Sequence, residues 1–296
     1  MRYMGREIFK LHFAVALAGT TGVFGKWISL NAVPLVWYRL LLSFAVCALY
    51  FICTRKSRNF SIRDFLKIGS VGAVLAIHWF LFYASIKLSN VSVGVICFSS
   101  TSFFTAILGP LLSHRKPSVK ETLFGISALA GVAFIFSFDL EYRQGIVAGV
   151  LCAVGASLFN ILNKRIGKNY SASTMLIGEL AGGSLLASVV LPLYLFFFRI
   201  PIVPVPGFPD FAKLLVFAVL CTVWLQFLQI QSLQDFSPFA VSLAFSLEPL
   251  YSILYATILF GEFREWSPAL IAGFALIVIP IALQTREIAR CGARNS

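Results

Sequence analysis

Residues 174–198 read TMLIGELAGGSLLASVVLPLYLFFF, a stretch of 25 residues with a single charged side chain, Glu179. A helix needs about 20 mostly apolar residues to cross the hydrocarbon core of a bilayer, so this stretch is long enough for one crossing. The rest of the chain is similar, because 59% of its 296 residues are hydrophobic and only 12% are charged. An ordinary globular protein has about 25% charged residues. The composition therefore indicates a membrane protein and excludes an ordinary water-soluble domain.

Ten stretches of this kind follow one another, with short polar breaks between them. They are residues 10–28, 34–53, 68–87, 90–112, 122–138, 145–163, 174–198, 212–232, 237–260 and 267–285. Their apolar runs are continuous and lack the alternating pattern of an outer-membrane barrel, which predicts helices rather than strands. The expected fold is an all-α integral membrane protein, a polytopic bundle of ten transmembrane helices.

The net charge of +12 arises from 24 Lys and Arg residues against 12 Asp and Glu residues. In a soluble protein this excess would suggest binding to nucleic acid. Here 17 basic residues fall on the side of the membrane that carries both predicted termini, and 6 fall on the opposite side. The positive-inside rule assigns the richer side to the cytoplasm. We therefore expect a multi-pass protein of the cell (inner or plasma) membrane with both termini cytoplasmic and no nucleic-acid partner.

The two halves of the chain resemble each other at an offset of 146 residues. SVGVICFSSTSFFT at 92–105 aligns with PFAVSLAFSLEPLY at 238–251. This predicts two five-helix repeats, residues 1–143 and 144–296. Because five is odd, the second repeat must be inverted relative to the first, about a pseudo-two-fold axis in the membrane plane. Such symmetry favours alternating access, since the two halves offer one opening to each side.

Four features in this order and spacing resemble the EamA-like family of the drug/metabolite transporter superfamily. They are WYRLL at 37–41, SLEPLYS at 246–252, LFGE at 259–262 and the Gly-containing segment from residue 269. The first half has HRK at 114–116 where the second half has GE at 261–262, so this signature is intact only in the second half. The resemblance implies a transporter of small metabolites, amino-acid-like or drug-like solutes, and it favours an exporter.

Charged side chains are costly in the hydrocarbon core, so each one within a span is a candidate functional residue. Glu248 lies near the middle of the ninth span and directly precedes Pro249, whose missing N–H predicts a helix break. An acidic group beside a broken helix is typical of transporter sites. We therefore interpret Glu248 as a substrate contact or a protonatable coupling group. The alternative is a kinked helix whose Glu bonds to a neighbouring helix.

Three further residues are candidates because of their position. Arg39 and Glu179 lie near the ends of their spans, where a long side chain can also reach the membrane interface. Arg39 is a candidate for attracting an anionic group or forming a gate. His78 lies near the middle of the third span, and the alternative for it is a hydrogen-bonded packing role.

Uncharged polar and aromatic residues complete the candidate substrate-binding or coupling site. Ser99 and Ser102 belong to a polar cluster in the middle of the fourth span, and Ser102 aligns with Glu248 at the repeat offset. Hydroxyls in membrane helices often bond to their own backbone, so a packing role is the alternative. The remaining candidates are rings and amides suited to line a cavity for a ring-bearing or apolar solute: Trp79, Tyr83, Trp224, Gln226 and Gln229.

Small residues recur at four-residue spacing in two of the spans. Such residues let membrane helices approach each other closely, so we interpret these surfaces as helix contacts. The residues are Gly145, Gly149, Ala153 and Ser157 in one span and Gly178 and Gly182 in the next.

A rival hypothesis is an integral membrane enzyme that acts on a lipid or a membrane-embedded substrate. Such an enzyme needs clustered His, Asp or Glu residues, a metal site, or a nucleophile with a base. The three His residues are far apart in sequence, the six Cys residues lack metal-ligand spacing, and no phosphate-binding GK[ST] loop occurs. We therefore expect a transporter and not an enzyme, with no cofactor and no metal. Its expected partners are a small-molecule solute, the lipid bilayer and protons as coupling ion.

Overall fold

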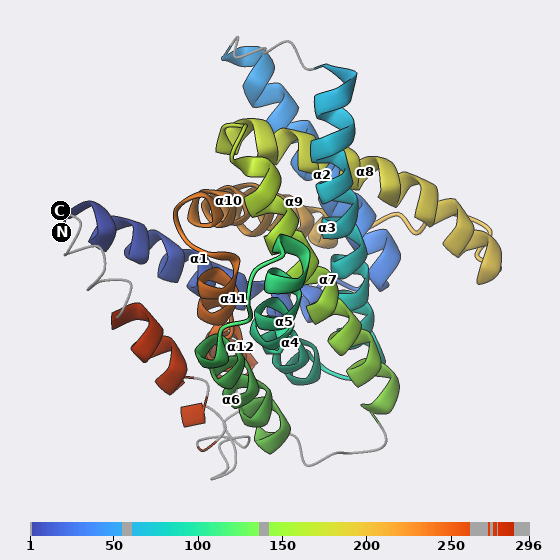
Figure 1. The fold of residues 1–296 in the computed structure, drawn as a ribbon. Coiled ribbons are helices and arrows are strands. Elements are labelled where there is room, and N and C mark those ends of the chain that lie inside the picture. The colour runs from blue at the N-terminus through green and yellow to red at the C-terminus, as the bar shows by residue number, and fades with distance from the viewer. Residues whose placement is uncertain are drawn as a thin grey trace.

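The structure is a computed structural model that describes residues 2–54, 61–135, 142–260, 272, 275–276 and 278–286. Within these residues the regular structure is helical, and Figure 1 shows the helices packed around one another. Seven helical segments of this described part are long and apolar enough to cross a membrane. The prediction of an all-helical membrane protein is therefore confirmed.

The helices lie close to the predicted spans. The continuous ones are α1 (Arg2–Trp27), α2 (Ala32–Cys53), α3 (Ile62–Leu88), α6 (Val119–Ile135), α7 (Arg143–Gly167) and α8 (Ala172–Phe197). Other predicted spans are divided into shorter helices: α4 (Val91–Ser99) with α5 (Thr101–Ser113), and α11 (Pro238–Phe245) with α12 (Glu248–Phe260). The predicted span 212–232 comprises α9 (Phe208–Ala218), the π-helical turn η2 (Val219–Trp224) and α10 (Leu225–Asp235). Gly261, Glu262 and parts of the predicted span 267–285, namely residues 267–271, 273–274 and 277, lie outside the described residues.

The helix boundaries recur at the offset between the two halves of the sequence. The α4 helix ends at Ser99 and α11 ends at Phe245, which are 146 residues apart. The α3 and α9 helices likewise begin 146 residues apart, at Ile62 and Phe208. This repetition is expected of a duplicated sequence, because local sequence determines where a helix begins and ends.

The two divided helices, α4–α5 and α11–α12, lie beside each other (Figure 1). Because α5 contacts α11 and α4 contacts α12, the two run antiparallel. Their breaks meet, with the Ser246 hydroxyl 3.0 Å from the carbonyl oxygen of Ser99 and 3.3 Å from the Ser102 hydroxyl. In return the Ser99 hydroxyl lies 3.4 Å from the carbonyl oxygen of Ser246. These hydroxyls supply partners to backbone carbonyls at helix ends.

The α3 helix packs against both α7 and α8 (Figure 1), and glycines bring α3 and α8 into backbone contact. A Cβ atom on Gly72 would lie 2.0 Å from the carbonyl oxygen of Glu179, and one on Gly182 would lie 2.3 Å from that of Gly69. A side-chain carbon cannot approach an oxygen so closely, so this helix distance requires glycine. The predicted contact surface around Gly182 is therefore observed, and it fixes the position of Glu179.

Replacing Gly72 with alanine is expected to lower the melting temperature of the purified protein in detergent. The added methyl group forces α3 and α8 apart, and overpacking of this kind costs about 1–3 kcal/mol. Gly109→Ala is the matched control, because Gly109 also lies within a helix but has open space around it. Thermal unfolding of both variants measures the difference. Equal melting temperatures would contradict the close contact between α3 and α8.

Candidate functional site

A small cavity of about 50 Å³ lies in the interior of the bundle. Helices α1, α2, α3, α7, α10 and α12 contribute side chains to its wall, with further residues from α4, α5 and α11. A buried water needs about 10–15 Å³ of such volume, so the cavity has room for a few water molecules. The following residues predicted from the sequence line it: Glu248, His78, Arg39, Trp79, Tyr83, Gln226 and Gln229. We call this space the central cavity.

Glu248 is the first residue of α12, and its side chain is 3% exposed. The hydroxyl of Thr21 on α1 donates to its Oε1 at 3.3 Å. A helix N-terminus favours negative charge, which partly offsets the cost of burying a carboxylate there. Pro249 is the second residue of α12, where its missing N–H leaves no helical bond unmade. The break in the span thus places a carboxyl group at a helix start inside the bundle.

Arg39 is 2% exposed and faces the same cavity, so it does not extend to the interface as its place in the span had suggested. Its guanidinium donates to the Thr222 hydroxyl at 2.6 Å, the Tyr83 hydroxyl at 2.8 Å and the Cys221 carbonyl at 2.8 Å. The guanidinium carbon also lies 3.7 Å from the centroid of the Trp79 ring. Three hydrogen bonds and a cation–π contact replace the water that Arg39 loses on burial.

The π-helical turn η2 positions two of these partners. Its backbone bonds span five residues instead of four, and such turns often occur at functional sites. The Thr222 hydroxyl donates to the carbonyl of Phe217, five residues earlier, while it accepts from Arg39. Trp224, the last residue of η2, is 45% exposed and packs against Phe13 with ring centroids 5.2 Å apart. Trp224 therefore lies outside the central cavity.

His78 lies on the cavity wall among aromatic rings. It is 5% exposed, and its Nδ1 is 3.4 Å from the carbonyl oxygen of Val74 on its own helix. The rings of Phe98 and Phe159 lie within 6.5 Å and 5.8 Å of the imidazole, measured between centroids. In the part of the chain that the structure describes, no three His, Cys, Asp or Glu side chains gather as metal ligands would.

A chain of hydrogen bonds connects the central cavity to a second cavity further along the bundle. Gln229 donates to the Asn160 side chain at 3.1 Å, and Asn160 donates to the Ser242 hydroxyl at 2.9 Å. The Thr105 hydroxyl lies 2.9 Å from that of Ser242 and 3.0 Å from that of Ser157. We call these five residues the polar cluster. It joins α5, α7, α10 and α11, with Asn160 at the central cavity and Thr105 at the second one.

Asn160 and Thr21 line the central cavity but were not among the candidates predicted from the sequence. Asn160 carried a usable signal, because it is an amide within an apolar span, as Gln226 is. Thr21 carried none, since a threonine in a membrane helix can bond to its own backbone.

Glu179 is fully buried and reaches the central cavity through a neighbour. Its Oε1 accepts from Asn163 at 2.6 Å and its Oε2 accepts from Gln226 at 3.1 Å. Gln226 also lines the cavity. Glu179 is therefore bound within the bundle by two amides, and its side chain does not extend to the interface.

Ser99 and Ser102 do not line the central cavity. They bond to Ser246 where the two helix breaks meet. Because Ser246 lies two residues before Glu248, these bonds support the turn from which α12 begins. Both serines thus bond to the residue before the turn that leads into α12.

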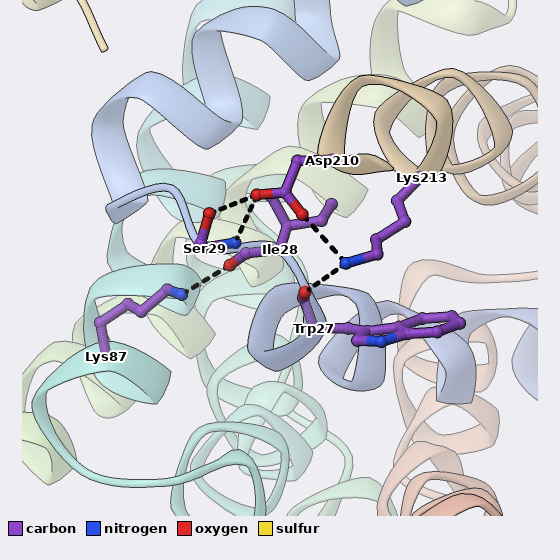
Figure 2. A network of polar contacts seen from close by, with 6 residues as sticks. All are labelled: Trp27, Ile28, Ser29, Lys87, Asp210 and Lys213. Atoms are coloured by element: carbon purple, nitrogen blue, oxygen red, sulfur yellow. Dashed lines mark hydrogen bonds and ion pairs between the residues drawn. The ribbon is translucent and has the colours of Figure 1, made fainter. Parts of the chain in front are cut away.

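A second group of polar contacts joins the end of α1 to α3 and α9 (Figure 2). Lys87 donates to the Ile28 carbonyl at 3.0 Å, and Lys213 donates to the Trp27 carbonyl at 3.1 Å. Lys213 also pairs with Asp210 at 3.0 Å, while Asp210 accepts from the backbone and hydroxyl of Ser29. Cations bound to free carbonyls at a helix C-terminus are favourable. We call these contacts the Asp210 network.

Comparison with known proteins gives both a family and a fold. The model of the EamA-like transporter family matches the chain twice, over residues 6–137 and 143–285. No curated protein matches the sequence. Solved structures do match, in 28 chains. One of them, described only as the crystal structure of a protein, has a TM-score of 0.74 and 16% sequence identity, covering 96% of this chain and 99% of its own. At that identity the match shows a shared fold.

Proposed function

The chain belongs to the EamA-like transporter family, and we propose that it is a secondary transporter that exports small metabolites by alternating access. Family membership favours transport over a membrane enzyme. The observation that carries the proposal is the central cavity, where a buried carboxyl group, Glu248, and a buried guanidinium, Arg39, face the same space. Charged groups inside a membrane bundle are costly and typically mark the pathway of a substrate or an ion.

The proposed topology has ten transmembrane helices in two inverted repeats, residues 1–143 and 144–296, with both termini in the cytoplasm. Three observations support it. Helix boundaries recur at an offset of 146 residues, and the two divided helices run antiparallel beside each other. The excess of Lys and Arg lies on the side of the termini, as the positive-inside rule requires for a cell membrane protein.

The proposed cargo is an amino-acid-like or drug-like solute. Glu248 suits an ammonium group, Gln226 and Gln229 suit polar groups, and rings such as Phe159 suit an apolar or aromatic part. Pockets for such molecules measure about 300–1,000 Å³, whereas the central cavity measures about 50 Å³. Binding therefore requires the lining helices to move, as alternating access demands. Glu248 is also the proposed proton-coupling group, because its carboxyl is the acidic group that directly lines the cavity.

Untargeted comparison of metabolites tests this proposal and identifies the cargo. Cells that overproduce the protein are compared with cells that overproduce a variant with Glu248→Gln, so that membrane load is matched. We expect a solute that is depleted inside the cells and enriched in the medium only with the wild-type protein. Enrichment inside the cells would reverse the proposed direction, and a new chemical product would favour an enzyme.

We propose that the Asp210 network acts as the outer gate of the transport pathway. It lies at the opposite end of α1 from the N-terminus, and it connects α1 and α3 of the first half to α9 of the second half. Asp210→Asn is expected to open this end more often, because the amide loses the ion pair with Lys213. A partly exposed ion pair contributes about 0.2–1 kcal/mol, which corresponds to an increase in the open population of up to about fivefold.

A cysteine placed at Ala18, on the central cavity wall, measures this gate in a background without native cysteines. Labelling from outside by a membrane-impermeant thiol reagent is expected to be faster with Asp210→Asn. Asp64→Asn is the control, since Asp64 lies near the start of α3, at the other end of that helix from Lys87. An unchanged labelling rate for Asp210→Asn would rule out a gating role for the network.

A further inference from the structure

A second, larger cavity opens where α5 and α7 end and α6 and α11 begin. Its volume of about 540 Å³ lies within the usual range for ligand pockets. Buried side chains form its floor, namely Thr105, Ile161 and Phe239. Cationic side chains surround the floor, most of them exposed: Arg115, Lys116, Lys164, Arg165 and Lys168. His114 also lies in the wall. Glu121 is the acidic residue in its wall. We call this space the basic cavity.

We propose that the basic cavity binds the phosphate group of an anionic ligand, either a membrane lipid headgroup or a soluble phosphate-bearing anion. The positive-inside rule explains the side of the membrane on which these cations lie. It does not explain why cations from two separate segments surround one cavity. Arg115 and Lys116 come from the connection between α5 and α6, whereas Lys164, Arg165 and Lys168 come from the end of α7.

The cations of α7 are arranged so that an anion would stabilise them. Lys168 is the C-cap residue of α7 and keeps helical backbone angles. Lys164, four residues before it, therefore lies on the same face, and the two ammonium groups repel each other. Lys164 is held in place by a hydrogen bond of 2.9 Å from its Nζ to the carbonyl oxygen of Gln234 on α10. A phosphate group between the two ammonium groups would replace this repulsion with two charge-assisted bonds.

Two helix starts add to the same preference for negative charge. The α6 and α11 helices both begin at the cavity, and Ser118 and Ser237 beside their first turns lie in its wall. Helix N-termini favour anions and bind phosphate groups through free backbone N–H groups. In the proposed topology this end faces the cytoplasm, where basic pockets between membrane helices bind lipid headgroups.

An anion in this cavity would also act on the helices that the polar cluster joins. Thr105 on the floor bonds to Ser157 of α7 and Ser242 of α11. A phosphate group bound above Thr105 would form a further connection between α5, α7 and α11, in addition to these hydrogen bonds. Ligand binding is therefore expected to raise the melting temperature, because it stabilises the folded state by mass action.

The test uses the full-length protein in nanodiscs of phosphatidylcholine. One arm adds inorganic pyrophosphate, and the other replaces part of the lipid with phosphatidylglycerol. The double variant Lys164→Gln/Lys168→Gln is compared with the control Arg63→Gln/Lys67→Gln. The control removes two cations at the start of α3. This part of α3 lies at the same end of the bundle as the basic cavity, since the hydroxyl of Tyr170, just beyond the end of α7, bonds to Asp64.

If a probe binds, we expect it to raise the melting temperature of both the wild-type protein and the control variant. Each cation near a phosphate contributes about 1 kcal/mol, so loss of two corresponds to roughly 30-fold weaker binding by the cavity variant. The rise in its melting temperature is therefore smaller at the same probe concentration. Arg115→Gln/Lys116→Gln, on the other wall, is expected to show the same loss, which guards against misfolding of one variant. A response to phosphatidylglycerol alone assigns the ligand to the lipid, and a response to pyrophosphate alone assigns it to a soluble anion. If both cavity variants respond to both probes as the control does, the proposal is wrong.

Discussion

Transport by the Glu248→Gln variant is expected to fall about 10- to 150-fold at low cargo concentration. The substitution keeps the shape of the side chain but removes its charge, and a hydrogen bond to a charged group contributes about 1.5–3 kcal/mol. Glu248 is buried at the start of α12, lines the central cavity and has Thr21 as its hydrogen-bond donor at 3.3 Å. Uptake or release of the cargo by proteoliposomes measures the effect.

The same variant separates cargo binding from proton coupling. If Glu248 carries the coupling proton, a pH gradient accelerates the wild-type protein and leaves Glu248→Gln unaffected. Asp235→Asn is the control, because it makes the same charge change at an exposed residue. Full transport by Glu248→Gln with an unchanged response to the gradient would show that this carboxyl group carries no proton.

Arg39→Met is expected to reduce both the stability of the fold and the rate of transport. It leaves the Tyr83 hydroxyl, the Thr222 hydroxyl and the Cys221 carbonyl without the donor that joins them. Loss of a partner leaves each buried polar group with a cost of about 1–3 kcal/mol. The three partners lie on α3 and η2, so the contact between α2 and both segments is weakened. Melting temperature and proteoliposome transport measure the two effects.

Arg39→Lys distinguishes the geometry of the guanidinium from its charge. Lysine keeps the positive charge near Glu248, but its single ammonium group cannot bond to partners that the planar guanidinium reaches in three directions. We expect Arg39→Lys to lose stability as Arg39→Met does. Arg63→Met, at an exposed position, is the control. Wild-type stability and transport in Arg39→Lys would mean that only the charge matters.

Much of the fold could be predicted because the bilayer imposes a simple rule on the sequence. Long apolar stretches must be helices, so the bounds of α2 and α8 differ from the predicted spans by at most two residues at either end. The helix break beside Glu248 could be predicted from Pro249, since proline lacks the N–H that a continuous helix requires. The matching break at Ser100 has no proline, so it was not predicted from the sequence.

The candidate site could be predicted less completely, because depth and direction depend on how helices pack. Arg39 is buried in the bundle because η2 and α3 supply its partners, which no local pattern reveals. Trp224, the last residue of η2, packs against Phe13 of α1 and lies outside the central cavity. Asn160 belongs to the site through bonds to α10 and α11, segments distant in the chain. For each of these residues, tertiary contacts override the local signal.

Counterflow in proteoliposomes tests the central claim most directly, namely that the central cavity serves a carrier that opens to one side at a time. Liposomes that contain the protein are loaded with unlabelled cargo, diluted, and supplied with a trace of labelled cargo outside. A carrier is predicted to accumulate label transiently above its equilibrium level, and Glu248→Gln is predicted to show no such overshoot. Label that equilibrates without an overshoot in the wild type, or that is converted to a product, would contradict the account.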